Sequence, residues 1–192
     1  PEGSPCADGT NAQPGGLVSF EILEPGQAPS KVGILKYGDE DVDPFPQDMA
    51  LDGQTLYVAD RWRGLLRVDA SDPASLVLAS DGGLLEPQEA CEDEDQNLAE
   101  TLACIDKNQP RQIAFDDSHV YVAASNLGVQ VWPKETAGTD APQATVPLSA
   151  TPGPLSAPAL GIAVKDSHAY VAAGKAVKLQ HFRVQGINLL QY

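Results

Sequence analysis

Three segments of the chain repeat one strand–turn–strand pattern and align without gaps. They run from Pro46 to Asp60, from Pro110 to Ala124 and from Ala159 to Ala173. Each begins with alternating small and apolar residues, passes through a polar turn and continues into a second strand with the sequence Tyr-Val-Ala. A repeat of this kind predicts a fold made by stacking similar units.

Two more strands are predicted after each hairpin. The third strands are expected at residues 64–69, 128–132 and 176–184, and the fourth at residues 76–79, 144–148 and 187–191. Four antiparallel strands per unit are typical of a propeller blade. Residues 17–23 and 31–37 have the pattern of the outer two strands of one more, incomplete blade. The predicted fold is all-β: a β-propeller-like array of four-stranded antiparallel blades, incomplete or irregular, with about three and a half blades.

These units resemble the LVIVD and YVTN families of propeller repeats. The resemblance is carried by Leu56-Tyr-Val-Ala-Asp60, Gly64-Leu-Leu-Arg-Val-Asp69 and Ser71-Asp-Pro73. The second unit departs from the pattern at Pro133, which replaces the third-strand Asp, and the third unit has no Ser-Asp-Pro. The resemblance implies a fold rather than one function, because propellers host many unrelated activities. Closed propellers have about four to eight blades, so either the array is small and irregular or a longer chain or assembly supplies more.

The segment before the first strand, residues 1–16, is predicted to be an extended arm because it is rich in Pro, Gly and small polar residues. Residues 17–192 are predicted to be a single propeller-like domain with an acidic insertion at residues 86–109. Cys91 and Cys104 bracket a loop in this insertion, and their spacing suits a local disulfide in an oxidising compartment. Two unrelated buried thiols are the alternative. Cys6 can pair across chains, join one of the other two cysteines or stay free.

The formal net charge of −15 argues against nucleic acid or an anionic membrane as a partner, because both are bound through clustered Lys and Arg. The apolar runs, such as residues 159–164, are much shorter than the roughly twenty residues that a membrane helix needs. The chain starts at Pro1 without an initiator Met or an apolar leader, which indicates a processed product. The expected location is therefore extracellular, on the cell surface or periplasmic.

Two acidic stretches, residues 38–46 and 89–96, carry the hard oxygen ligands that calcium prefers. Neither stretch matches the regular twelve-residue calcium loop with its central Gly and terminal Glu. Solvated acidic loops are the simpler interpretation, and calcium on these loops is the alternative.

The histidines His119, His168 and His181 are the candidate metal ligands. His119 and His168 occupy the same repeat position, at the start of the second strand. If residues 174–175 form a two-residue turn, His168 lies opposite His181, and the same count across residues 125–126 sets His119 opposite Trp132. Opposed β-carbons are about 5 Å apart, so two imidazoles in this register can share one ion. A slip of one residue would put His168 and His181 on opposite faces, and hydrogen-bonding surface histidines are the plain alternative.

Imidazole suits copper, zinc, nickel or iron, and the acidic chain attracts cations. An acidic, secreted protein with two histidines near a Trp is similar to the surface copper-binding proteins of methane-oxidising bacteria, the MopE and CorA type. In that family copper(I) is held by two His and an oxidised Trp. The likeness implies that the ligands are among His119, His168 and His181 and that Trp132 is the candidate for oxidation.

An enzyme is the least favoured interpretation, because the chain lacks a Gly-x-Ser-x-Gly elbow, a Walker-type loop and a His-Glu-x-x-His helix. Ser118-His119 and Ser167-His168 are neighbours in sequence, so each pair is expected to point to opposite faces of a strand. The sequence therefore predicts a secreted, non-enzymatic binding protein, most specifically one for copper. The alternatives are a protein-interaction or scaffold module that binds a partner or itself through blade edges, and a propeller-type lactonase or other hydrolase.

Overall fold

The computed structural model describes residues 16–37, 44–61, 63–83, 109–138, 141–148, 158–174, 179–185 and 188–191. These residues form strands and contain no helix, which confirms the all-β prediction. Within them, no helix is long and apolar enough to cross a membrane.

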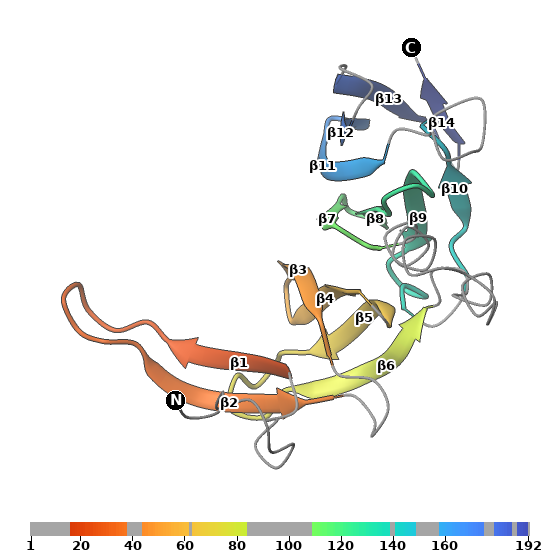
Figure 1. Ribbon diagram of the computed structural model, residues 1–192. Helices are drawn as coiled ribbons and strands as arrows, with labels where there is room; N and C mark the ends of the chain where they lie inside the picture. Colours follow the sequence, from red (N-terminus) through yellow and green to blue (C-terminus); the bar gives the residue numbers. More distant parts are fainter. Residues whose placement is uncertain are drawn as a thin grey trace, which may run out of the picture.

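The described strands form one two-stranded sheet and three four-stranded antiparallel sheets, which follow one another along an open arc (Figure 1). The N-terminal sheet consists of β1 (Gly16–Glu21) and β2 (Ser30–Lys36). The first blade consists of β3 (Pro46–Asp52), β4 (Thr55–Asp60), β5 (Gly64–Asp69) and β6 (Val77–Gly83). The second blade consists of β7 (Gln112–Phe115), β8 (His119–Ala123), β9 (Val129–Pro133) and β10 (Ala144–Val146). The third blade consists of β11 (Ala159–Lys165), β12 (His168–Ala173), β13 (Leu179–Gln185) and β14 (Asn188–Gln191).

The predicted hairpins are all present, and the turns fit their sequences. In the third blade Lys165 pairs with His168 across a two-residue turn. Both turn residues, Asp166 and Ser167, have positive φ angles of 50° and 61°, as a type I′ hairpin turn requires. In the first blade the corresponding turn begins with Gly53, whose φ is 58°.

The first and second blades pack against a neighbouring sheet on both faces because alternate residues of a strand point into different interfaces. In β8, Val120 and Val122 pack against the first blade, whereas Tyr121 and Ala123 pack against the third. In β4, Val58 faces the N-terminal sheet together with Leu66 and Val68 of β5. Tyr57 and Ala59 of β4 face the second blade. Every side chain named in this paragraph is at most 2% exposed. Stacked apolar faces therefore hold the array together.

Side chains of the inner strands also link one blade to the next. Asp48 of β3 accepts a hydrogen bond from the backbone amide of Ile113 in β7, with Oδ2 at 2.8 Å. Gln112 of β7 accepts one from the amide of Ile162 in β11, with Oε1 at 2.8 Å. Asp48 and Gln112 occupy the same repeat position, so the link is part of the repeat.

The N-terminal sheet is tied to the first blade through the buried carboxylate of Asp60. Asp60 Oδ2 accepts hydrogen bonds from the Tyr37 hydroxyl at 3.0 Å and the Phe45 amide at 2.8 Å. Asp60 Oδ1 accepts one from the Arg63 amide at 3.1 Å. Burial, and next the charge of Asp60, raise the pKa of Tyr37 well above its usual value, so the hydroxyl remains a donor.

Several predicted features lie outside the described residues. They are Cys6, the cysteine pair Cys91 and Cys104 with nearly all of the acidic insertion, and the acidic runs at residues 39–43 and 89–96. The disulfide, the N-terminal arm and calcium on the acidic loops remain predictions.

Candidate functional site

The turn that leads into β8 is organised by the carboxylate of Asp116. Its Oδ1 accepts hydrogen bonds from the amides of Ser118 at 2.9 Å and His119 at 2.8 Å. Its Oδ2 accepts one from the hydroxyl of Tyr121 at 2.7 Å. An Asp side chain that caps the following amides is the usual device for such a turn. Asp116 thereby fixes the backbone that carries His119.

The same contacts set the protonation of the turn. Burial of Asp116 by itself would raise its pKa, but the hydrogen bonds from Tyr121, Ser118 and His119 outweigh it and hold the pKa below the usual value. For Tyr121, burial and then the bond to Asp116 raise the pKa far above the usual value. The pair is therefore a carboxylate and a neutral phenol at neutral pH.

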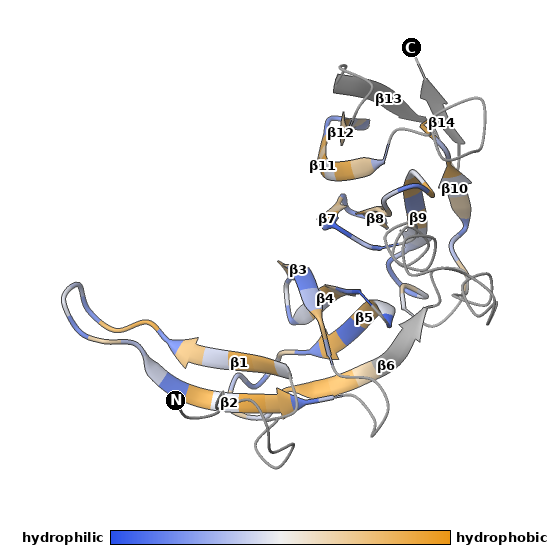
Figure 2. Cartoon of the chain, viewed as in Figure 1, coloured by the Kyte–Doolittle hydropathy of each residue, from blue (hydrophilic) through white to orange (hydrophobic). Residues whose placement is uncertain are grey.

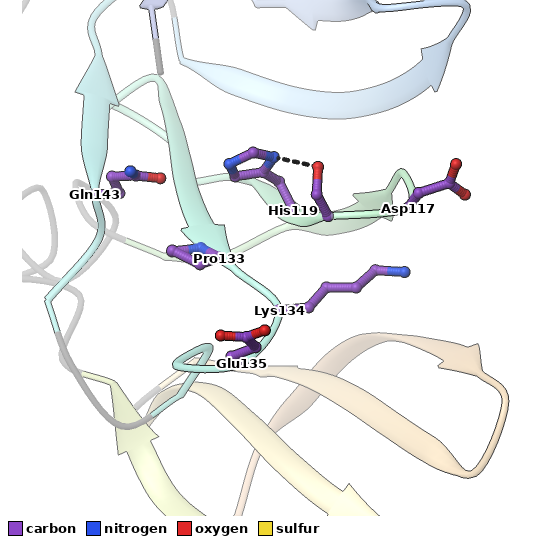
Figure 3. Close-up of a pocket in the computed structure, with 7 residues that line it drawn as sticks. Asp117, His119, Pro133, Lys134, Glu135 and Gln143 are labelled. Atoms are coloured by element: carbon purple, nitrogen blue, oxygen red, sulfur yellow. Dashed lines mark hydrogen bonds between the residues drawn. The ribbon is translucent and has the colours of Figure 1, made fainter. Parts of the chain in front are cut away.

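Ser118 and His119 interact directly, which corrects the expectation that they point apart. Ser118 Oγ lies 2.8 Å from His119 Nδ1 (Figure 3). The expectation was wrong because Ser118 belongs to the turn, where side chains do not alternate as they do in a strand. The Oδ1 atom of Asp116 is 3.8 Å from the same Nδ1. In a Ser-His-Asp triad the serine and the carboxylate occupy different ring nitrogens, so this arrangement orients the imidazole but does not reproduce a triad.

His119 lines a pocket of about 430 Å³ at the end of the second blade where β8 begins and β9 ends. Ser118 contacts the Nδ1 edge of the ring, and Figure 3 shows the opposite edge turned toward Gln143. The remaining lining residues are Asp117, Pro133, Lys134 and Glu135. The pocket thus places one ring nitrogen, an amide and side chains of both charges around a space large enough for a small polar ligand.

The pocket residues that follow β9 in the chain, Lys134 and Glu135, are held in place by contacts with the first blade. The ammonium of Lys134 forms an ion pair with Asp52 and lies 4.7 Å from the centre of the Phe115 ring. Arg67 donates a hydrogen bond to the backbone carbonyl of Glu135 at 2.8 Å. The positions of Lys134 and Glu135 therefore depend on the contact between the first and second blades.

Trp132 does not share a site with His119. His119 pairs with Pro133, and Trp132 pairs with Val120, one residue away from the predicted register. A shift of one residue moves a side chain to the other face of the sheet. Trp132 is fully buried against the first blade, whereas the His119 side chain is 20% exposed. The predicted juxtaposition of these two residues was wrong.

The register also differs from the prediction at His168. His168 pairs with Arg183, and His181 pairs with Tyr170, so the two histidines are two residues out of register. His168 Nδ1 lies 2.7 Å from the backbone carbonyl of Asp166. The His181 side chain lies outside what the structure describes. In the described part of the chain, no three His, Cys, Asp or Glu side chains cluster as a metal site would require.

Sequence reasoning did not identify the apolar faces that the array leaves uncovered. On the outer face of the N-terminal sheet, Val18, Phe20 and Ile34 are 47%, 55% and 48% exposed, and Val18 pairs with Ile34. Figure 2 shows hydrophobic residues along much of β1 and β2. On β3 of the first blade, Met49 and Leu51 are 54% and 58% exposed. The signal was available in β1 and β2, where residues on both faces are apolar, as in a strand buried on both sides.

The model of the LVIVD repeat family matches residues 46–81, the segment that forms the first blade. No curated protein matches the chain. Similar solved structures include the computationally designed Ika4 protein, with a TM-score of 0.45 and 13% identity over 76% of this chain and 69% of that one. The computationally designed Ika8 protein has a TM-score of 0.49 and 13% identity over 86% of this chain and 40% of that one. The WD40 β-propeller domain of Doa1 has a TM-score of 0.47 and 10% identity over 77% and 40%.

The chain thus spans 40% of the length of two of these structures, and the similarities concern the fold alone. The matched repeat and the series of four-stranded sheets show that the chain is a β-propeller repeat protein whose described blades form an open array.

Proposed function

We propose that the chain is a protein-binding module that receives its partner on the outer face of the N-terminal sheet. The observation that carries the proposal is the group of exposed apolar side chains there, Val18, Phe20 and Ile34. Single exposed apolar residues are common on protein surfaces, but a contiguous group of them on one sheet face is typical of an interaction site.

The other faces of the array support this proposal. The inner face of the same sheet packs Leu17 and Tyr37 on the first blade, and both side chains are at most 5% exposed. The first and second blades cover each other in the same way. The outer face therefore has the composition of a blade interface but has no covering sheet among the described residues. A partner that brings an apolar sheet face satisfies it.

A photo-crosslinking amino acid at Phe20 tests this proposal in cells that produce the protein. We expect one predominant crosslinked partner, identified by mass spectrometry, whose yield falls strongly when Ile34→Asp is added. The matched control carries the crosslinker at the exposed Ser71, on the first blade, and should not capture that partner. Equal adducts from both positions, or no adduct from Phe20, would contradict the proposal.

Copper bound through His168 and His181 is the second candidate function, and it is supported by their positions on the adjacent strands β12 and β13 and by the net charge of −15. Metal analysis of protein purified without tags or chelators tests it. We expect stoichiometric copper that is lost in His168→Ala and His181→Ala. Because His119 lies on the second blade, His119→Ala should retain the metal. Metal-free wild-type protein would rule out this candidate. A location outside the cytoplasm is part of the same proposal.

A further inference from the structure

Met49 and Leu51 mark a second uncovered surface, at the inner end of the first blade. Met49 pairs with Val58 and Leu51 with Leu56, so both lie on the blade face that packs against the N-terminal sheet. Val58 is completely buried there, whereas Met49 and Leu51 are 54% and 58% exposed. The two strands of the N-terminal sheet therefore cover the outer part of this face and leave its inner strand open.

The repeat shows what normally covers this position. Met49 corresponds to Ile113 in the second blade and Ile162 in the third, which are only 6% and 5% exposed. The inner hairpin of the preceding blade covers each of them. In both cases it presents Ala in its first strand and Tyr-x-Ala in its second. These residues are Ala50, Tyr57 and Ala59 in the first blade and Ala114, Tyr121 and Ala123 in the second.

The hydrogen bonds between blades point to the same missing element. The amides of Ile113 and Ile162 each donate to an Asp or Gln side chain of the preceding inner strand. Met49 stands at the equivalent position, and among the described residues only β1 and β2 precede its strand, so no inner strand of a preceding blade is there to supply such a side chain. An inner strand with Asp or Gln at that repeat position would provide this acceptor.

The N-terminal sheet has a free edge next to this surface. In the described part of the chain β1 pairs only with β2, and Figure 1 shows β1 on the side of the sheet nearer to β3. Unpaired amides and carbonyls along such an edge are a template for another strand. A strand added to β1 would continue the established interface between the N-terminal sheet and the first blade.

We propose that a partner β-hairpin of this same repeat type docks over Met49 and Leu51, pairs with the free edge of β1 and completes a four-stranded blade. Its first strand carries Asp or Gln, followed two residues later by Ala, and its second strand carries Tyr-x-Ala. The hairpin comes from outside the described residues. The inference goes beyond the proposed function because it concerns a different surface, and either can fail without the other.

Met49 is the only methionine of the chain, so the added oxygen of its sulfoxide reports on this surface in an intact-mass spectrum. The probe is a cyclised peptide of residues 110–124, which carries Gln112, Ala114 and Tyr121 and no Met. Cyclisation is needed because an isolated hairpin is marginally stable in water. In dilute hydrogen peroxide we expect Met49 to oxidise as an exposed Met, and the peptide at saturation to slow the reaction at least about five-fold.

Two controls make the result specific. A peptide with Tyr121→Asp should give no protection, and a peptide with Gln112→Leu should give less. In the chain, Leu51→Glu should abolish protection, whereas Leu160→Glu, at a 49% exposed position on the third blade, should preserve it. The proposal is overturned if the peptide leaves the oxidation rate unchanged. It is also overturned if Met49 of the chain alone becomes more protected as the protein concentration rises, since a second copy then covers the surface.

Discussion

The carboxylate of Asp48 in the first blade accepts a hydrogen bond of 2.8 Å from the backbone amide of Ile113 in the second. β3 and β7 belong to different sheets, so their backbone amides and carbonyls do not pair with each other through β-ladder hydrogen bonds. A side chain takes that role, and Gln112 repeats it toward Ile162. The spacing between blades is thus set by polar contacts at the inner strands as well as by apolar contacts between the faces.

Asp48→Leu should lower the free energy of unfolding by about 1–3 kcal/mol, because the buried Ile113 amide loses its acceptor. Asp48→Asn keeps an acceptor oxygen and should cost clearly less. Urea unfolding of both variants and the wild type measures the difference. Equal losses for the two variants would show that charge, rather than the hydrogen bond to Ile113, is what matters at this position.

Asp116→Asn should destabilise the protein at neutral pH by about 1–2 kcal/mol, because it disrupts the acceptor for Tyr121 and for the turn amides. The pKa of Asp116 is lowered in the folded state. Its stabilisation is therefore complete above the unfolded pKa of about 3.9 and is lost as the pH falls through the folded pKa. The variant and the wild type should converge in acid.

Urea titrations at about pH 7 and about pH 3 test this pH dependence. The neighbouring Asp117 is exposed and makes the matched control, so Asp117→Asn should match the wild type at both values. A penalty for Asp116→Asn that is the same at both pH values would contradict the role assigned to its ionised form.

Asp60→Ala should cost about 3–5 kcal/mol, since it leaves the Tyr37 hydroxyl and the amides of Phe45 and Arg63 without their buried acceptor. Tyr37→Phe removes a single bond and should cost about 1 kcal/mol. Hydrogen exchange gives the spatial readout, because β1 and β2 should lose protection before β8 and β9 in Asp60→Ala. Uniform loss of protection across all of these strands would show that Asp60 does not specifically hold the N-terminal sheet.

The strands and blades could be predicted because apolar alternation and turn residues are local signals. The pairing register of the second blade could not be predicted from these local signals. A two-residue turn at residues 125–126 was assumed, but Ser125 pairs with Ala159 of the third blade, with hydrogen bonds of 3.2 Å and 2.7 Å between their backbones. This contact lengthens the connection, so that Ala123 pairs with Val129. A contact with another blade is not encoded in the spacing of residues within one hairpin.

The predicted registers of the histidines were wrong for the same reason. Its geometry depended on counting residues across two turns, and a turn longer by a single residue separates His119 from Trp132 by the thickness of the sheet. In the third blade Ala172 pairs with Leu179, so the connection is longer than two residues there as well. The interaction of Ser118 with His119 was missed because a turn residue was treated as part of a strand. The uncovered faces depend on which blades are adjacent, which a single repeat does not specify.

His119 and Trp132 should behave as independent residues, because they lie on opposite faces of the second blade. We expect His119→Ala to cost less than about 1 kcal/mol, since its ring lines the pocket and is not part of the apolar core clusters. Trp132→Phe opens space in the core between the first two blades and should cost about 2–3 kcal/mol. The double variant should lose the sum of the two within about 0.5 kcal/mol, as residues whose side chains share no contacts do. The coupled pair Asp116→Asn and Tyr121→Phe, joined by a hydrogen bond of 2.7 Å, provides the positive control and should deviate from additivity. A coupling between His119 and Trp132 as large as that of the control pair would mean that they share a site after all, and would restore Trp132 as a neighbour of a bound metal.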